Sequence, residues 1–343
     1  MKLKSVHMSC PESLGDFALS FDDEQGSPKP LTLVFGGPGS GKTTLLTALA
    51  HTRPGHTVAM NLRPTDPPCF ARSEWWLGLD EPDRVHPLRL WSPNAGPELA
   101  EADPAARRDV ALFDKLAREG GFVFVAFSAM RWFSRSPLIL SAPERSVRRY
   151  DVRSNEPLDD AARNDLSRDV KQALVYAAIV RALPEVDGDR HQILGDTMSR
   201  VVNSLTRALG YEYIGISPTS LEPTFVGRER VQLPFDALPS AVKHAAAFGA
   251  LTLRALWAAY PGLNPELAQG LVVIDQIELH QDASVAAILL ERLLAALPNV
   301  QWIVTTRSQE LLASRNPDEC VALRRLDPAG KVSVHWGPDA HVH

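Results

Sequence analysis

The sequence lacks most of the features that mark secreted and membrane-spanning proteins. Its 343 residues include only three cysteines, Cys10, Cys69 and Cys320, whose wide spacing fits neither a zinc site nor a disulfide framework. Reduced thiols in a cytoplasmic protein are therefore expected. The longest apolar stretch, 245–260, contains Arg254 and is too short to span a bilayer. The N-terminal residues carry charges with no apolar core behind them, so we expect no signal peptide and no membrane segment.

Net charge and the lack of repeats narrow the class of protein further. A formal charge of −5 argues against a protein that coats nucleic acid through bulk charge, although a local basic patch is compatible with it. The sequence contains no internal repeat, no low-complexity tract and no heptad run long enough for a coiled-coil arm. An apolar content of 45% and a charged content of 22% are ordinary for a globular protein. We expect one domain, 1–343, with a helical subdomain at about 155–210.

The most informative stretch is rich in glycine and matches the pattern G-x-x-x-x-G-K-[ST] in full. It follows an apolar run, 31–35, and precedes a helical one, 45–50, which is the strand–turn–helix context of a phosphate-binding loop. Glycines let successive N–H groups turn toward an anion, and the helix N-terminus adds its positive end. We expect this loop to bind a nucleoside triphosphate through Gly36, Gly37, Pro38, Gly39, Ser40, Gly41, Lys42, Thr43 and Thr44.

An acidic residue that could complete the site follows a second buried strand. Four aliphatic residues, 271–274, lead directly into Asp275, at the carboxyl end where open α/β sheets bind ligands. We expect Thr43 and Asp275 to hold Mg²⁺, while Lys42 reaches the β- and γ-phosphates. The stretch 79–82, Leu-Asp-Glu-Pro, has a similar acidic pattern. We reject it because only Leu77 and Leu79, separated by a glycine, precede its acidic residues, which is not a buried strand.

The remaining periodicity predicts an α/β fold with a mostly parallel sheet flanked by helices and an antiparallel N-terminal portion. Residues 63–105 have no clear period and are interpreted as an insertion or a set of short elements. Strands are predicted at 3–8, 17–21, 31–35, 57–62, 122–127, 211–216, 224–226, 230–233, 271–274 and 301–306, and helices at 105–119, 159–183, 187–209, 239–260 and 283–297.

Three stretches resemble the ABC-class ATPases of the SMC, RecF and OLD group. Residues 275–280, Asp-Gln-Ile-Glu-Leu-His, resemble the family's "D-E-x-E-L-H" ending of Walker B, and 303–312 resemble its switch segment. Residues 238–243 resemble the signature at the start of a helix. The resemblance implies an ABC-ATPase-like P-loop fold that hydrolyses ATP and dimerises around it, with Ser240 of one subunit near the γ-phosphate held by the other. It also implies work in DNA transactions or phage defence.

The sequence departs from the family pattern at three positions. Gln276 stands where the family has the acid that polarises water, Arg307 where it has a histidine that senses the γ-phosphate, and Ala241 where it has a signature glycine. An amide positions water but cannot take its proton, and loss of a general base typically lowers rates by about 10²–10⁴. Arg307 keeps a donor for phosphate. Gln276 is either a natural divergence or a substitution made to trap ATP, and the simultaneous changes at 241 and 307 favour divergence.

We therefore predict a slow ATPase that uses ATP and Mg²⁺, with Lys42, Gln276 and Arg307 as its catalytic residues, and that acts as an ATP-dependent homodimeric switch. Without a nuclease domain, it would act through a separate effector or nuclease protein; nucleic acid is a possible further partner. The alternative is an ATP sensor that does not hydrolyse its ligand. A kinase or GTPase is disfavoured because the sequence has neither a guanine-reading N/T-K-x-D motif nor an arginine-bearing lid after the loop.

Arginines are frequent between 131 and 153, where they could grip phosphates or an acidic partner or could form an ordinary solvated surface. Arg131 directly follows the predicted strand 122–127, so we expect it at the sheet edge that carries the loop. Glu278 is a second acid near the Walker B stretch and could replace the missing base.

Overall fold

The computed structural model describes most of the chain, and the central sheet and its helices lie within the described part. The described residues are 2–10, 14–52, 70–76, 88–91, 104–119, 123–138, 165–182, 190–260, 262–325 and 330–342. The strand predicted at 57–62, the stretch 79–82 and the arginines from 145 to 153 lie outside these ranges. No helix in the described ranges is both long enough and apolar enough to cross a membrane.

A six-stranded sheet forms the centre of the molecule, with its strands in the order β13-β12-β3-β11-β10-β6. Every pair in it is parallel except the antiparallel pair at the edge, β12 with β13. The predicted mostly parallel sheet is therefore confirmed. Its strands are β3 (Leu31–Phe35), β6 (Phe124–Phe127), β10 (Gly270–Ile274), β11 (Val300–Thr306), β12 (Cys320–Arg324) and β13 (Ser333–Trp336).

The two faces of this sheet belong to two different apolar cores, because successive side chains of a strand point to opposite faces. In β10, Val272 and Ile274 join one core, whereas Leu271 and Val273 join the other. A strand buried on both faces reads as a continuous apolar run, which is why the sequence revealed β6, β10 and β11.

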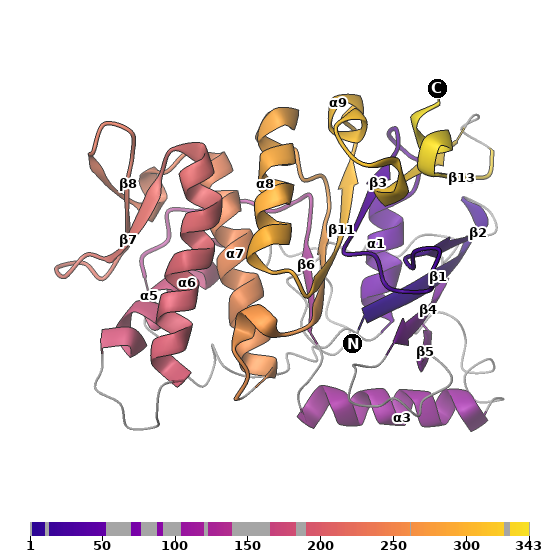
Figure 1. Ribbon diagram of the computed structural model, residues 1–343, viewed down its shortest axis with the longest axis horizontal. Coiled ribbons are helices and arrows are strands. Elements are labelled where there is room, and N and C mark those ends of the chain that lie inside the picture. The colour runs from indigo at the N-terminus through magenta and orange to yellow at the C-terminus, as the bar shows by residue number, and fades with distance from the viewer. Residues whose placement is uncertain are drawn as a thin grey trace.

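One core is built from helices that cover the side of β6, β10 and β11 (Figure 1). Its longest member, α7, is buried along most of its length. A small antiparallel sheet, β7-β8-β9, lies beside the helical pair α5 and α6 at one end of the molecule. The elements are α5 (Ser167–Ala182), α6 (Arg190–Thr206), η3 (Arg207–Leu209), β7 (Glu212–Ile216), β8 (Pro223–Val226), β9 (Gln232–Pro234), η4 (Phe235–Ala237), α7 (Ser240–Ala259), η5 (Pro265–Leu267), α8 (Ala283–Ala296) and α9 (Gln309–Ala313).

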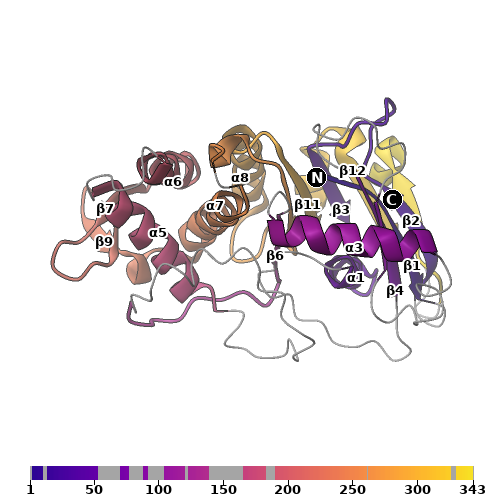
Figure 2. The ribbon, with the colours of Figure 1, turned by 90° about the horizontal axis from the view of Figure 1, so that it is seen from below.

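The other core joins the central sheet to an antiparallel sheet of order β2-β1-β4-β5. Helix α1 packs in this core, and α3 contacts β5 and lies across the molecule in the view from below (Figure 2). The predicted antiparallel N-terminal portion is thus confirmed. The elements are β1 (Lys2–Cys10), β2 (Gly15–Ser20), α1 (Lys42–His51), β4 (Phe70–Trp76), β5 (Leu88–Trp91) and α3 (Pro104–Glu119), with η6 (Pro317–Glu319) and η7 (Gly337–His341) near the C-terminus.

The structure corrects one expectation and decides between two interpretations of another segment. Cys10 is disulfide-bonded, whereas Cys320 is free and buried, so the prediction of three reduced thiols was wrong for Cys10. The segment 63–105 contains β4 and β5, which pair with β1 and with each other, so its described part is a set of short elements. The helical patterns at 159–183 and 187–209 are observed as α5 and α6, although their status as a subdomain of a single domain stays a prediction.

Candidate functional site

The glycine-rich loop joins β3 to α1 at the carboxyl edge of the central sheet. Gly39 and Gly41 adopt positive φ angles of 74° and 89°, which side chains other than glycine rarely tolerate. A Cβ atom at Gly36 would lie 2.7 Å from the Leu323 carbonyl oxygen, so the backbone passes too close to β12 for any larger residue. Pro38 is exposed between these glycines, and the Gly36 N–H donates to the Thr306 carbonyl at 3.3 Å.

The ammonium group of Lys42 is held inside this loop. Its Nζ atom donates to the carbonyl oxygens of Gly36 at 2.6 Å and Gly37 at 2.8 Å, and to Ser40 Oγ at 3.3 Å. Burial, followed by the nearby charge of Arg307, lowers the pKa of Lys42 to about 8, against the opposing effects of Asp275 and Glu278. This lysine is thus a cation with little solvent, at the point where the loop would receive a phosphate.

The loop and the second predicted stretch meet through the Asp275 carboxylate. Thr43 Oγ1 donates to Asp275 Oδ2 at 2.7 Å, and Thr305 Oγ1 donates to Asp275 Oδ1 at 2.5 Å. Asp275 is not on the strand next to β3, because β11 intervenes in the sheet. The Thr305 hydroxyl at the end of β11 fills the intervening space. Asp275 is fully buried, so the hydroxyls of Thr43 and Thr305 supply hydrogen bonds that water cannot give to its carboxylate.

These groups fit a hydrated magnesium ion bound with phosphates. Mg²⁺ prefers oxygen ligands and usually keeps several waters when one or two protein groups and substrate phosphates hold it. Thr43 is exposed and supplies a hydroxyl next to the Asp275 carboxylate. Within the described ranges no three His, Cys, Asp or Glu side chains gather into a closed metal site. An ion held by Thr43 and Asp275 would therefore need phosphate and water oxygens to complete its shell.

The segment after Asp275 has an uncommon backbone that a buried arginine supports. Gln276 has a positive φ of 49°, a conformation seldom adopted outside glycine. The Arg131 guanidinium donates to the carbonyls of Asp275 at 2.6 Å, Gln276 at 2.7 Å and Ser128 at 2.8 Å. Burial lowers the pKa of Arg131 to about 10, which still leaves it charged at neutral pH. Arg131 lies at the predicted edge and holds the Gln276 segment rather than offering a solvated cation.

Glu278 and Arg307 lie in the same place. Glu278 Oε1 accepts the Arg307 backbone N–H at 2.8 Å, whereas Glu278 Oε2 is buried without a hydrogen-bond partner. The charges of both side chains affect the pKa of Lys42, with Arg307 lowering it and Glu278 raising it. The Gln276 backbone N–H donates to Thr305 Oγ1 at 2.8 Å. We use the name phosphate-loop edge for this group: residues 36–44, Arg131, 275–280, Thr305 and Arg307.

Ser240, the remaining predicted ligand, starts α7 and is exposed. Among the described residues, no hydrogen bond joins it to the loop at 36–44. One turn further along α7, His244 Nδ1 lies 2.8 Å from the Ser240 carbonyl, and the His244 ring stacks on His280 at 5.6 Å. Burial, followed by the charge of Arg131, lowers the pKa of His244 to about 3, so this histidine is neutral at pH 7. The start of α7 is thereby tied to the segment that follows Asp275.

Sequence reasoning missed Thr305 and His244. Thr305 ends a buried strand, and its position beside the Asp275 strand was the available signal, since carboxyl ends of parallel strands share an edge. His244 had no signal, because its partner His280 lies 36 positions later and meets it only through the packing of α7. The structure thus brings Lys42, Thr43, Asp275, Gln276 and Arg307 together, whereas Ser240 makes no hydrogen bond with the loop among the described residues. The roles assigned to these residues stay predictions.

A glycine loop between a buried strand and a helix, facing an acidic strand end in a mostly parallel sheet, defines the P-loop class of α/β folds. The SMC head domain from Thermotoga maritima is similar to this chain, with 14% identity, 98% of this chain and 99% of that chain covered, and a TM-score of 0.47. An SMC head domain with an extended coiled coil from Pyrococcus furiosus, bound to the C-terminal domain of ScpA, has 15% identity, coverage of 98% and 96%, and a TM-score of 0.48.

A third structure, an SMC head bound to the C-winged helix domain of ScpA, is 12% identical, with 98% of each chain covered and a TM-score of 0.49. Comparison with family models and with curated proteins finds no match. The assignment to the P-loop class rests on the strand order and on the loop geometry.

Proposed function

We propose that this protein binds ATP with Mg²⁺ at the phosphate-loop edge and hydrolyses it slowly, as an ATP-dependent switch of the ABC class. The observation that carries the proposal is the 2.7 Å hydrogen bond from Thr43 to Asp275, because it joins the two sequence motifs that a triphosphate and its metal would need. Lys42 would exchange its bonds with the loop carbonyls for bonds with phosphate oxygens. The metal, when bound, would neutralise phosphate charge.

Slow hydrolysis is inferred from the groups available to activate water. Arg131 holds the backbone carbonyl of Gln276. The Gln276 side chain has no carboxylate, so its amide can orient a water molecule but cannot remove a proton. Glu278 is the alternative base that we propose, since one of its oxygens is buried without a hydrogen-bond partner. Arg307 would stabilise charge on the γ-phosphate. These assignments support a rate well below that of an enzyme with a properly placed acid.

The proposed switch uses two subunits, because Ser240 is exposed at the start of α7 and, among the described residues, makes no hydrogen bond with the loop of its own chain. The sequence resemblance implies that the start of α7 closes over the nucleotide of a second copy. Size-exclusion chromatography with and without MgATP tests this, and an ATP-dependent shift to dimer is expected. Ser240→Arg should abolish the shift, whereas Ser27→Arg, an exposed serine just before the start of β3, should leave it intact. A monomer peak unchanged by ATP would contradict the proposal.

The second candidate is an ATP sensor that does not hydrolyse its ligand, which the amide at Gln276 favours. Phosphate release measured on the unaltered chain separates the two candidates. Appreciable release that disappears with Lys42→Ala would exclude the sensor. Release that stays undetectable even with Gln276→Glu would exclude the ATPase.

The downstream partner is proposed from the sequence resemblance alone: a separate effector or nuclease protein, in a cytoplasmic DNA transaction or in phage defence. A pull-down from the native host with ATP present, repeated with Lys42→Ala, tests this. The expected result is a nuclease or other effector retained by the unaltered chain and lost with the variant. Retention of such a protein by both chains would contradict ATP-dependent recruitment.

A further inference from the structure

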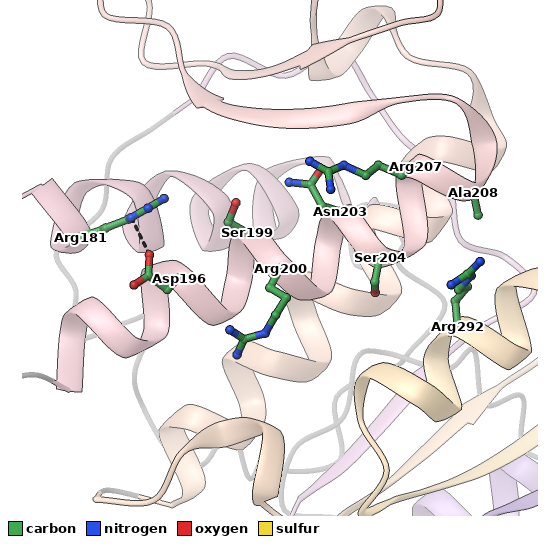
Figure 3. A pocket seen from close by; sticks show the side chains of 9 residues that line it. All are labelled: Arg181, Asp196, Ser199, Arg200, Asn203, Ser204, Arg207, Ala208 and Arg292. Carbon is green, nitrogen blue, oxygen red and sulfur yellow. Dashed lines mark ion pairs between the residues drawn. The ribbon is translucent and has the colours of Figure 1, made fainter.

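A polar cavity lies on the helical side of the molecule, lined by residues of α5, α6, η3 and α8 (Figure 3). Its volume is about 620 Å³, within the range of about 300–1,000 Å³ that small-molecule sites occupy. Four arginines line it: Arg181 on α5, Arg200 on α6, Arg207 on η3 and Arg292 on α8. We call this cavity the arginine cleft.

Three arginines of the cleft form ion pairs with carboxylates and still keep much of their side chains exposed to solvent. Arg200 forms a bidentate pair with Glu266, with Nε at 2.9 Å and a terminal nitrogen at 2.5 Å from its oxygens. Arg181 pairs with Asp196 at 2.8 Å, and Arg207 pairs with Glu212. The side chain of Arg181 remains 54% exposed, that of Arg200 59% and that of Arg207 61%.

The lining has a surplus of positive charge in a chain whose formal charge is −5. Among the described residues that line the cleft, Asp196 is the acidic one, against four arginines. The carboxylates of Glu266 and Glu212 hold their arginines from outside the lining. Among the described residues, Arg292 forms no ion pair, so its guanidinium is available to a ligand.

We propose that the arginine cleft binds a small anion that carries two or more phosphate groups. A guanidinium offers paired donors that match phosphate oxygens, which is why arginine is preferred where phosphate is recognised. Arg200 and Arg207 are seven residues apart, which is roughly 10 Å along a helix, too far for one phosphate but suited to several. No aromatic side chain lines the cleft in the described part of the chain, so the phosphates rather than a base would be recognised.

The cleft is separate from the phosphate-loop edge, since none of its lining residues belongs to that group. Its anion binding can therefore be tested apart from the proposed ATPase. Tripolyphosphate is a suitable probe because it carries phosphates without a base. Calorimetric titration would use the unaltered protein, Lys42→Ala, and Lys42→Ala combined in turn with Arg292→Gln, with the cleft pair Arg200→Gln/Arg207→Gln, and with the pair Arg168→Gln/Arg228→Gln. The last is a matched control that removes two exposed arginines outside the cleft.

The proposal predicts that Lys42→Ala still binds tripolyphosphate, because the cleft is intact. Adding the cleft substitutions to Lys42→Ala should weaken this binding at least tenfold, while adding the control substitutions should change it less than twofold. Arg292→Gln offers a second check, since this residue has no ion pair in the described part whose loss could disturb the fold; a weakening of several-fold is expected.

Several results would overturn the proposal. One is binding in the Lys42→Ala background that neither cleft substitution nor Arg292→Gln alters, or that the control pair weakens equally. Another is inorganic phosphate binding as tightly as tripolyphosphate, which would deny a site for several phosphates. A third is duplex DNA or poly-glutamate binding more tightly than tripolyphosphate and losing its affinity with the same cleft substitutions.

Loss of tripolyphosphate binding with Lys42→Ala alone would also contradict the proposal, and would assign the anion to the loop. Failure of the ATPase proposal is seen separately, in ATP binding and phosphate release.

Discussion

The phosphate-loop edge and the arginine cleft both gather charged side chains, but they bury them to opposite extents. Asp275 and Thr305 are 0% exposed and Arg131 is 2% exposed, and each makes short hydrogen bonds. The paired arginines of the cleft are more than half exposed. A buried polar network fixes positions and tolerates little change, whereas exposed ion pairs contribute little to stability and leave donors for a ligand.

The first way to test this contrast is to change the chemistry of the buried site without changing its shape. Gln276→Glu replaces an amide by a carboxylate of the same size, at a position whose backbone Arg131 and Thr305 hold. Phosphate release should rise by about 10²-fold or more, since general-base catalysis typically contributes 10²–10⁴. An unchanged rate would show that the side chain at position 276 does not activate the attacking water.

The companion variant Glu278→Gln distinguishes the source of any basal rate. If Glu278 is the base in the unaltered chain, its loss should remove basal phosphate release while ATP affinity changes little. If the basal rate persists in Glu278→Gln, this residue is not the base.

Burial predicts a large difference in stability between the arginines of the two regions. Arg131→Met removes three charge-assisted hydrogen bonds and leaves buried carbonyl oxygens without a donor, so the free energy of unfolding should fall by about 3 kcal/mol. Arg207→Gln, at an exposed ion pair, should lower it by less than about 1 kcal/mol. Urea unfolding of the two variants measures both values. Equal losses would contradict the contrast between the two regions.

Removing the carboxylate at the buried site should affect metal dependence rather than fold. Asp275→Asn keeps one oxygen that can accept from Thr43 or Thr305, places an amide NH2 toward the other hydroxyl, which can accept from it, and removes the charge that would hold the magnesium shell. The ratio of ATP affinity in magnesium to that in chelator should fall by roughly tenfold. Titration under both conditions measures it, and an unchanged ratio would remove Asp275 from the metal site.

The pH dependence of ATP binding provides a smaller test. Lys42 has a pKa of about 8, lowered chiefly by burial, so it is charged below pH 8 and loses its proton above it. A triphosphate favours the charged lysine, so affinity should be nearly constant from pH 6.5 to 7.5. It should then fall by at most about tenfold per pH unit above pH 8. The arginines of the cleft stay charged over the same range. Affinity that rises above pH 8 would contradict this role for Lys42.

The sequence was sufficient for those parts of the site that short motifs define. The loop at 36–44 and Asp275 could be predicted to meet because parallel strands bring their carboxyl ends to one edge. The order of the strands could not be predicted: β11, which carries Thr305, lies between β3, which precedes the loop, and β10, which precedes Asp275. The buried strands β6, β10 and β11 could be read as apolar runs, whereas β4, β5, β12 and β13 have weaker patterns and were not predicted.

The parts that could not be predicted depend on contacts between distant residues. The stacking of His244 on His280 requires α7 to pack beside the segment after β10. The arginine cleft draws residues from 181 to 292, which no local pattern links. The disulfide at Cys10 was missed because the spacing of cysteines in sequence does not report their distance in the fold.

The most direct test of the central claim is calorimetric titration of MgATP into the unaltered chain and into Lys42→Ala. The account predicts one site per chain at the phosphate-loop edge, with affinity weakened by about 10²-fold when the buried ammonium group is removed. No heat and no affinity for the unaltered chain, or equal affinity for both chains, would contradict it.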